Sequence, residues 1–274
     1  MAIKNTLTTS KPKFTAVINS EGYKTLINNT LRDPKRAARF VTALTSAVTT
    51  NPALQECEAS TIVSAALLGE SLNLSPSPQL GQYYLVPFND TKNGRKVSSF
   101  ILGYKGYLQL AIRSGYYKKI NVLPIKEGEL ISYDPLEEVV EVKLIDDETA
   151  REKAKTVGYY AMFEYTNGFR KAMYWSREKM EAHAMAYSKG YAAKKGYTFW
   201  EKDFDAMAQK TMLRQLISKW GIMSVEMQTA YEKDTAIINK DGEAEYFDAP
   251  TADDVPAAPA PSAQDVPFES ILAE

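Results

Sequence analysis

Residues 157–175 read VGYYAMFEYTNGFRKAMYW. The segment consists of two runs rich in aromatic and apolar side chains, which is typical of β-strands. Asn167-Gly168 separates the runs, and this dipeptide favours a tight hairpin turn because both residues tolerate positive φ angles. We therefore predict strands at 157–165 and 169–175, paired as an antiparallel hairpin.

Around this hairpin the sequence alternates between strand-like and helix-like stretches. Further strands are predicted at residues 82–88, 96–102, 120–125 and 139–144. Helices are predicted at residues 33–50, 58–73, 103–114, 176–188, 203–220 and 224–238, the first with Asp33 as N-cap and Pro34 at the first helical position. Helices thus precede and follow a group of strands, which argues for an α+β fold rather than a doubly wound parallel sheet.

The composition limits the class of protein. With 274 residues, of which 45% are hydrophobic, the chain can bury a sizeable core. It has no run of about 20 apolar residues and its first residues are polar, so we expect neither a transmembrane helix nor a signal peptide. One cysteine and one histidine exclude a disulfide framework and a metal site that needs several cysteines or two histidines. We expect a cytoplasmic protein.

Charge is strongly segregated along the chain, although the net charge is only −1. Residues 241–274 contain nine acids and no base, and residues 127–148 contain nine acids and one base. In contrast, residues 92–126 contain eight bases and no acid, and residues 168–219 contain eleven bases and five acids. Such basic blocks are the electrostatic footprint of a polyanion site, with a merely solvated basic surface as the alternative.

The sequence divides into three parts. We expect residues 1–20 to be a flexible N-terminus, residues 21–240 a folded body, and residues 241–274 a disordered acidic tail. Five of the 13 prolines fall in residues 249–267, and this Pro/Ala-rich composition buries too little apolar surface to order itself. Residues 266–272 mix apolar residues with acids, which fits either a docking peptide or the end of a solubilising tail.

The sequence carries no convincing signature of catalysis. Residues 190–196 lack the spacing of a phosphate-binding loop, and no Gly-x-Ser-x-Gly motif occurs. His183 lies in a predicted helix among Ala and Met, as a structural histidine would. Asp146-Asp147-Glu148 stands in a polar stretch, as in a solvated loop. We therefore expect that the protein is not an enzyme and needs no cofactor.

Polar side chains recur at helical spacing on two of the predicted helices. A spacing of four residues places them on one side, opposite an apolar side, where they can contact phosphates. Pairs of basic residues also follow the first of these helices and the Asn167-Gly168 turn. A solvated charge is the ordinary alternative for each, but clusters on different elements favour a shared ligand. The candidates are Lys105, Gln109 and Arg113 on helix 103–114, Lys118 and Lys119 after it, Arg170 and Lys171 beyond the turn, and Lys210, Thr211 and Arg214 on helix 203–220.

Three stretches of sequence resemble the motifs of a known family. Residues 84–88 read YLVPF, and GYKGY at residues 103–107 runs into LAIRSG at residues 110–115. Residues 200–216 read WEKDFDAMAQKTMLRQL. In order and spacing these motifs resemble those of the RecT family of phage single-strand annealing recombinases, and the resemblance covers roughly residues 25–225.

The resemblance implies ATP-independent annealing of complementary DNA by a homo-oligomer, a ring or helical filament, that holds single strands and annealed duplex. It implies a phage or prophage 5′-to-3′ exonuclease as partner. As a docking peptide, residues 266–272 would bind this exonuclease or a host single-strand binding protein. The implied fold is similar to that of eukaryotic annealing proteins, with an antiparallel sheet on a long helix. Residues 21–240 would form the DNA-binding and oligomerisation domain. Lys105, Arg113, Lys210 and Arg214 lie in the matching motifs.

An annealing protein must hold a strand by its phosphates and leave the bases free, because phosphate contacts carry no sequence information. We expect a basic groove formed by the Lys105 helix, the Arg170 hairpin and the Lys210 helix. The alternatives are a single-strand nucleic-acid binding module that does not anneal, a structural oligomer whose basic face packs on its own acidic block at residues 127–148, and a nuclease.

Overall fold

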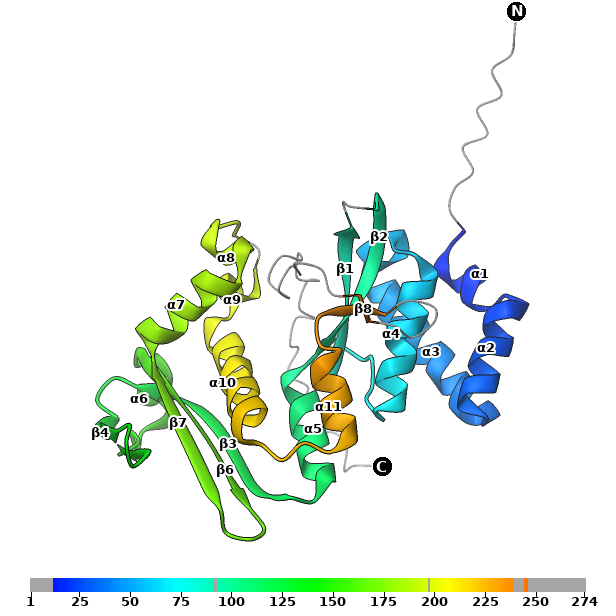
Figure 1. Cartoon of the computed structure of the whole chain (residues 1–274). Coiled ribbons are helices and arrows are strands. Elements are labelled where there is room, and N and C mark those ends of the chain that lie inside the picture. The colour runs from blue at the N-terminus through cyan, green and yellow to red at the C-terminus, as the bar shows by residue number, and fades with distance from the viewer. Residues whose placement is uncertain (1–11, 91–92, 197, 239–243, 246–274) are drawn as a thin grey trace, which may run out of the picture.

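The computed structural model describes residues 12–90, 93–196, 198–238 and 244–245 (Figure 1). The helices of this part of the chain are α1 (Phe14–Ile18), α2 (Glu21–Leu31), α3 (Pro34–Thr50), α4 (Ala59–Ser71), α5 (Tyr104–Ser114), α6 (Glu148–Lys153), α7 (Arg177–Tyr187), α8 (Lys189–Ala192), α9 (Phe199–Lys202), α10 (Phe204–Trp220) and α11 (Val225–Glu232), with a 3-10 helix at Pro52–Glu56. The strands are β1 (Tyr83–Asp90), β2 (Arg95–Leu102), β3 (Tyr117–Lys126), β4 (Leu130–Asp134), β5 (Val139–Val142), β6 (Thr156–Tyr165), β7 (Arg170–Ser176), β8 (Ala236–Ile238) and β9 (Ala244–Glu245). The predicted α+β class is confirmed.

The strands of the described residues form three antiparallel sheets. The first has the order β1-β2-β8-β9, the second β3-β6-β7, and the third is the pair β4-β5. In the second sheet the predicted hairpin is confirmed, since Gly158 pairs with Ser176 and Glu164 with Arg170. Gly168 in its turn has a φ of 89°, a conformation that glycine adopts without strain.

The long helix α10 packs on the second sheet, against β6 and β3 (Figure 1). Tyr159, Ala161 and Phe163 are fully buried at alternate positions of β6, as the two-residue period of a strand requires. Tyr159 also donates a hydrogen bond to Asp205 at the start of α10, and Tyr165 donates one to the Trp220 carbonyl at its end. The prediction of an antiparallel sheet packed on a long helix is therefore confirmed.

Helix α4 packs on the first sheet, and α1 to α3 lie beyond it (Figure 1). One side of α4 is completely buried and includes Ile62, Ala65 and Ala66. A Cβ atom at position 69 would stand 2.3 Å from the ring of Tyr83, so only glycine permits this close approach of α4 to β1. The first sheet and the N-terminal helices thus form one packed unit.

Five predicted helices are confirmed within two residues at each end, as α3, α4, α5, α7 and α10. At the start of α3 the side chain of Asp33 accepts a hydrogen bond from the Lys35 backbone N–H at 2.9 Å, which is the expected N-cap. The predicted strands are confirmed as β1, β2, β3, β5, β6 and β7. Strand β3 begins at Tyr117, so Lys118 and Lys119 lie within a strand.

The prediction of one helix over residues 224–238 is wrong at its C-terminal end. Helix α11 ends at Glu232, and Thr235 has a φ of 72°, which no helix accommodates. Residues 236–238 then form β8, in which Ile237 pairs with Ser99 of β2. All three residues of β8 are buried, so an apolar run that fits a helix by composition instead forms a strand between β2 and β9.

Helix α1 and strand β9 lie close to the two expected domain boundaries. Part of the segment predicted to be a flexible N-terminus forms α1, in which Phe14 and Ile18 are buried one helical turn apart. At the other end, residues 244–245 pair with β8, so a boundary at residue 240 separates two paired strands. The rest of the predicted acidic tail lies outside the described residues.

Candidate nucleic-acid interface

Helix α5 presents Lys105, Gln109 and Arg113 on one exposed side, as predicted. The opposite side is buried, and Tyr107 belongs to the core. A Cβ atom at Gly106 would lie 2.0 Å from the Gln82 carbonyl oxygen, so this glycine sets the close packing of α5 on the start of β1. The packing fixes the direction in which the polar row faces.

The two ends of this row have different surroundings. The side chain of Lys105 lies against Gly81, next to the hydroxyl of the exposed Tyr84. Arg113 instead donates hydrogen bonds to the carbonyl oxygens of Leu72 and Asn73, beyond the last turn of α4. Arg113 thus satisfies carbonyls that a helix end leaves without partners, while its side chain remains exposed.

At the end of the second sheet that carries the β6–β7 turn, three exposed cations surround one carboxylate. Lys118 Nζ lies 2.6 Å from Glu164 Oε1, Lys119 is the partner of Glu164 in the β3–β6 register, and Arg170 is its partner in the β6–β7 register. Arg170 also donates a hydrogen bond to the Tyr160 hydroxyl at 3.1 Å. Lys118 foremost, then Lys119 and Arg170, hold the pKa of Glu164 below its usual value. We call Lys118, Lys119, Glu164 and Arg170 the strand-end cluster.

Lys171 does not join this cluster, although it follows Arg170 directly. Successive residues of a strand point to opposite faces, so Lys171 faces the α10 side of the sheet. Its ammonium lies 3.4 Å from the centre of the Trp220 ring and forms an ion pair with Glu138, which leaves its side chain only 11% exposed. The exposed Trp220 therefore has a cation on one of its faces.

The helical spacing of Arg214 in α10 suggests an exposed polar side chain, but its guanidinium contacts a buried carboxylate. Its Nη1 donates to Asp234 Oδ2 at 2.6 Å, and the Asp234 side chain is fully buried. The same carboxylate accepts hydrogen bonds from the Tyr107 hydroxyl of α5 at 3.0 Å and from the Leu102 N–H of β2 at 2.9 Å. Asp234 thereby joins β2, α5 and α10.

This arrangement differs from the expected polar side of helix 203–220, because the Arg214 guanidinium is paired with a buried carboxylate. Loss of the guanidinium leaves a buried carboxylate without its counter-charge, which destabilises the fold. Lys210 and Thr211 lie on the same helix and are half buried. Of the sequence candidates, the structure brings Lys118, Lys119 and Arg170 together and places Arg214 in a buried network.

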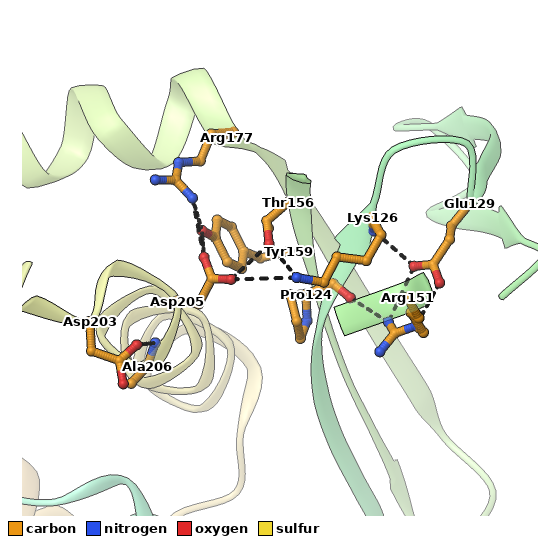
Figure 2. A network of polar contacts seen from close by, with 10 residues as sticks. All are labelled: Pro124, Lys126, Glu129, Arg151, Thr156, Tyr159, Arg177, Asp203, Asp205 and Ala206. Atoms are coloured by element: carbon orange, nitrogen blue, oxygen red, sulfur yellow. Dashed lines mark hydrogen bonds and ion pairs between the residues drawn. The ribbon is translucent and has the colours of Figure 1, made fainter. Parts of the chain in front are cut away.

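A second polar network attaches the start of α10 to the second sheet (Figure 2). Asp205 accepts hydrogen bonds from the Tyr159 hydroxyl at 2.6 Å, from Thr156 Oγ1 at 2.7 Å and from Arg177 Nη1 at 3.1 Å. Lys126 Nζ is 3.9 Å from the same carboxylate. Burial, followed by the bond to Asp205, raises the pKa of Tyr159, so this hydroxyl stays protonated and donating.

The remaining part of this network fixes the base of the β4–β5 hairpin (Figure 2). Glu129, whose side chain is fully buried, accepts a hydrogen bond from Arg151 Nε at 2.6 Å and one from the Lys126 N–H at 2.8 Å. Arg151 also donates to the Pro124 carbonyl at 2.9 Å. Asp205 and Glu129 are therefore committed to structural partners.

The β4–β5 hairpin itself exposes several large apolar side chains. Leu136 is 90% exposed and Ile131 is 65% exposed, and Tyr133, Val139 and Val142 are also exposed. The surrounding segment is the acidic block of residues 127–148. An acidic surface repels DNA, so this hairpin is suited to a protein partner rather than to a nucleic acid.

Within the described part of the chain no group of three or more His, Cys, Asp or Glu side chains is placed to hold a metal ion. None of the described helices is both long and apolar enough to cross a membrane.

The fold and the surface define an α+β protein with exposed cations at a strand end and along one helix. The chain belongs to the RecT family, whose model matches residues 38–248. It is 30% identical to protein RecT of Escherichia coli (strain K12) over 219 residues, which are 79% of this chain and 78% of that protein. It is also 42% identical over 196 residues to the uncharacterized protein YqaK of Bacillus subtilis (strain 168), covering 72% of this chain. The match spans 63% of the length of YqaK.

Proposed function

We propose that this chain anneals complementary DNA strands without ATP and thereby promotes homologous recombination. Membership of the RecT family supports a role in single-strand annealing and recombination. The strand-end cluster is the structural observation that carries the proposal, since three exposed cations share one carboxylate and retain an excess of positive charge.

The proposed path of the strand follows the polar row of α5 and continues over the strand-end cluster. Helix α5 ends at Ser114 and β3 begins at Tyr117, so the two surfaces are joined by a short connection. Lys105 and Gln109 contact phosphates at one end of this path, and the cations around Glu164 contact them at the other. Contacts of this kind hold a strand without reading its sequence, which leaves the bases available for pairing.

Base pairing itself supplies the free energy of annealing in this proposal. Stacking in duplex DNA stabilises it by about 1.4 kcal/mol per base-pair step, so a few correct pairs suffice to retain the second strand. The protein contributes alignment and lowers the repulsion between two polyanions. No step of this scheme is catalytic, and none requires nucleotide hydrolysis.

The test mixes two complementary, fluorescently labelled oligonucleotides with the protein in EDTA and without ATP. The fluorescence of the labels reports strand pairing. We expect rapid pairing in the presence of the protein. Coating without pairing would support a non-annealing single-strand binding module, and shortened strands would support a nuclease. Absence of binding would support a structural oligomer and contradict the proposal. The matched control is the Lys118→Ala/Arg170→Ala variant, which should bind and pair more slowly.

We further propose that the β4–β5 hairpin mediates self-association with a second copy of the chain. The hairpin is acidic and exposes apolar side chains, whereas α2 and α3 expose the bases Lys24, Lys35 and Arg39. These helices and the hairpin lie at opposite ends of the molecule in Figure 1. Contact between unlike ends of successive copies is heterologous, and such contacts generate rings or helical filaments.

Sedimentation velocity with and without single-stranded DNA tests this contact. Leu136→Glu should reduce assembly size, because it places a charge in an apolar contact. Val225→Ser changes an exposed apolar residue of α11 and is the matched control, with no expected effect. Equal assembly of Leu136→Glu and the wild type would contradict the proposal.

Two protein partners are proposed from the family and the sequence alone. They are a phage 5′-to-3′ exonuclease that supplies single strands and the host single-strand binding protein. Residues 266–272 are the proposed docking segment, because they combine apolar and acidic residues. Titration of a labelled peptide of residues 262–274 with each purified partner measures docking. Lack of binding to both partners would contradict the proposed docking segment.

A further inference from the structure

A row of aromatic and basic side chains runs along α7 and includes the end of β7. Trp175, Lys179, His183 and Tyr187 follow one another at steps of four residues. The rings of Trp175 and His183 have centroids 5.4 Å apart, and those of His183 and Tyr187 are 4.5 Å apart. Lys179 Nζ lies 4.7 Å from the centre of the Trp175 ring. We call these four residues the α7 row.

The opposite side of α7 anchors the helix. Met180 and Ala184 are fully buried, and Ser176 caps the helix by accepting a hydrogen bond from the Lys179 N–H at 3.3 Å. The row therefore stands on a helix whose orientation is fixed. Tyr187 remains 65% exposed, while Trp175 and His183 are half buried, so the rings become more accessible toward the end of α7.

Two exposed cations, Lys179 and Lys219, lie in or near this row. Burial foremost, then the nearby charges of Arg214 and Lys219, hold the pKa of His183 below its usual value, so its ring is neutral near pH 7. Lys179 and Lys219 are exposed, whereas Arg214 is paired with Asp234. The acids of α7, Glu178 and Glu181, lie off the row.

We propose that the α7 row is a stacking surface for the bases of single-stranded DNA, with Tyr187 as the ring that receives the outermost base. The proposal rests on the proposed function, because it assumes that the chain binds DNA. Aromatic side chains interleaved with cations match the chemistry of a single strand, in which every base has a stacking face and every phosphate a charge. Bases within a duplex are already stacked, so this surface selects single strands.

A purely structural cluster does not account for the most exposed ring. A tyrosine that stabilises the core is normally buried, and the buried anchors of α7 are Met180 and Ala184 instead. A protein partner would favour a surface less rich in charge, because charged residues are depleted at the centre of protein interfaces. Lys179 on the Trp175 ring and Lys219 nearby thus favour a nucleic acid.

The experiment compares two ligands of equal length and charge. One is oligo(dT) of about 20 nucleotides, and the other is an abasic oligonucleotide that retains the phosphates. Tyr187→Ala should weaken binding of oligo(dT) about tenfold, because base stacking on one aromatic side chain has roughly that effect, and should leave binding of the abasic strand unchanged. Tyr187→Phe retains the ring and should retain wild-type affinity.

Met185→Ala is the matched control, since Met185 is an exposed residue of the same helix that lies off the row. Equal affinity of Tyr187→Ala and the wild type for oligo(dT), or equal loss for both ligands, would overturn the stacking proposal while DNA binding itself remained. If the wild type bound neither ligand, the proposed function would fail as well.

Proton NMR supplies a second, independent measurement. His183 is the single histidine of the chain, so there is one histidine Hε1 signal to assign. Oligo(dT) should move the Hε1 resonance of His183 through the ring current of a stacked base or of a displaced Tyr187. The abasic strand should cause a smaller shift. Identical shifts with both ligands would show that the row senses phosphate charge only and would overturn the proposal.

Discussion

The strand-end cluster and the Arg214–Asp234 pair each place arginine or lysine against one carboxylate, yet they differ in both burial and charge balance. The Glu164 side chain is 26% exposed and has three cations around it, whereas Asp234 is completely buried and has one. The first arrangement has positive charge in excess at an accessible surface. The second is neutral and lies between three structural elements.

The difference distinguishes basic residues that can bind a polyanion from basic residues that stabilise the fold. An exposed ion pair contributes little to stability, because water already solvates both charges. A buried pair contributes little net stability either, but removal of one partner leaves a desolvated charge and is costly. Sequence position alone does not distinguish these two kinds of basic residue, since Arg214 lies in a basic block as Lys118, Lys119 and Arg170 do.

The largest expected effect follows from breaking the buried pair. Arg214→Met should lower the free energy of unfolding by about 3 kcal/mol, which is the low end of the range for a broken buried pair because the Arg214 side chain is one-third exposed. Urea denaturation followed by circular dichroism measures the loss. Lys118→Ala is the control and should change stability by less than about 0.5 kcal/mol.

The double variant Arg214→Met/Asp234→Asn sharpens this prediction. Asparagine removes the uncompensated charge, so the double variant should lose less stability than the sum of the single variants. Additive losses would mean that the two side chains do not stabilise each other, contrary to the 2.6 Å contact.

The next effect concerns DNA affinity and should appear only in the exposed cluster. Replacement of Lys118, Lys119 and Arg170 by alanine removes up to three phosphate contacts, so the slope of log K against log salt should become shallower by about 0.7 × 3. Affinity near 0.1 M salt should then fall by roughly a hundredfold. Fluorescence anisotropy at several salt concentrations measures both. An unchanged slope in a folded triple variant would remove the strand-end cluster from the DNA path.

The sequence predicts the second sheet well because its signals are local. Asn167-Gly168 specifies the hairpin turn, and the flanking runs have the length and composition of strands. Asp33-Pro34 likewise fixes the start of α3 within a few residues. Strand β8 was missed because its structure depends on pairing with β2, far away along the chain, rather than on its own composition.

The same distinction applies to the candidate interface. Helical spacing correctly places Lys105 and Gln109 on an exposed side of α5, but it cannot reveal that Asp234, 20 residues after Arg214, is buried beside that arginine. Adjacency in the sequence suggests that Lys171 and Arg170 act together, but successive residues of a strand point to opposite faces of the sheet. The α7 row has a regular spacing in the sequence, but Ser176 divides it between a strand and a helix.

The smallest expected effect tests the charge balance within the exposed cluster. Glu164→Gln removes the one carboxylate shared by three cations and should tighten binding of single-stranded DNA by a few-fold at low salt, where screening is weak. The direction is opposite to that of the alanine variants. Arg170→Gln is a matched control of similar size and should weaken binding instead.

The difference in DNA affinity between the wild type and Glu164→Gln should depend on pH. The reason is the lowered pKa of Glu164, for which Lys118 is the largest cause. At neutral pH the wild-type carboxylate is ionised, and its pairing contribution to stability is fully present above its ordinary pKa of 4.5. As the pH falls through the lowered pKa, Glu164 takes up a proton, that contribution is lost, and the three cations become available to phosphates. Wild type and Glu164→Gln should therefore differ in DNA affinity from neutral pH down to 4.5 and converge below it. Anisotropy titrations across this range measure the convergence, and a difference that disappears already near neutral pH would show that Glu164 is not held ionised by Lys118.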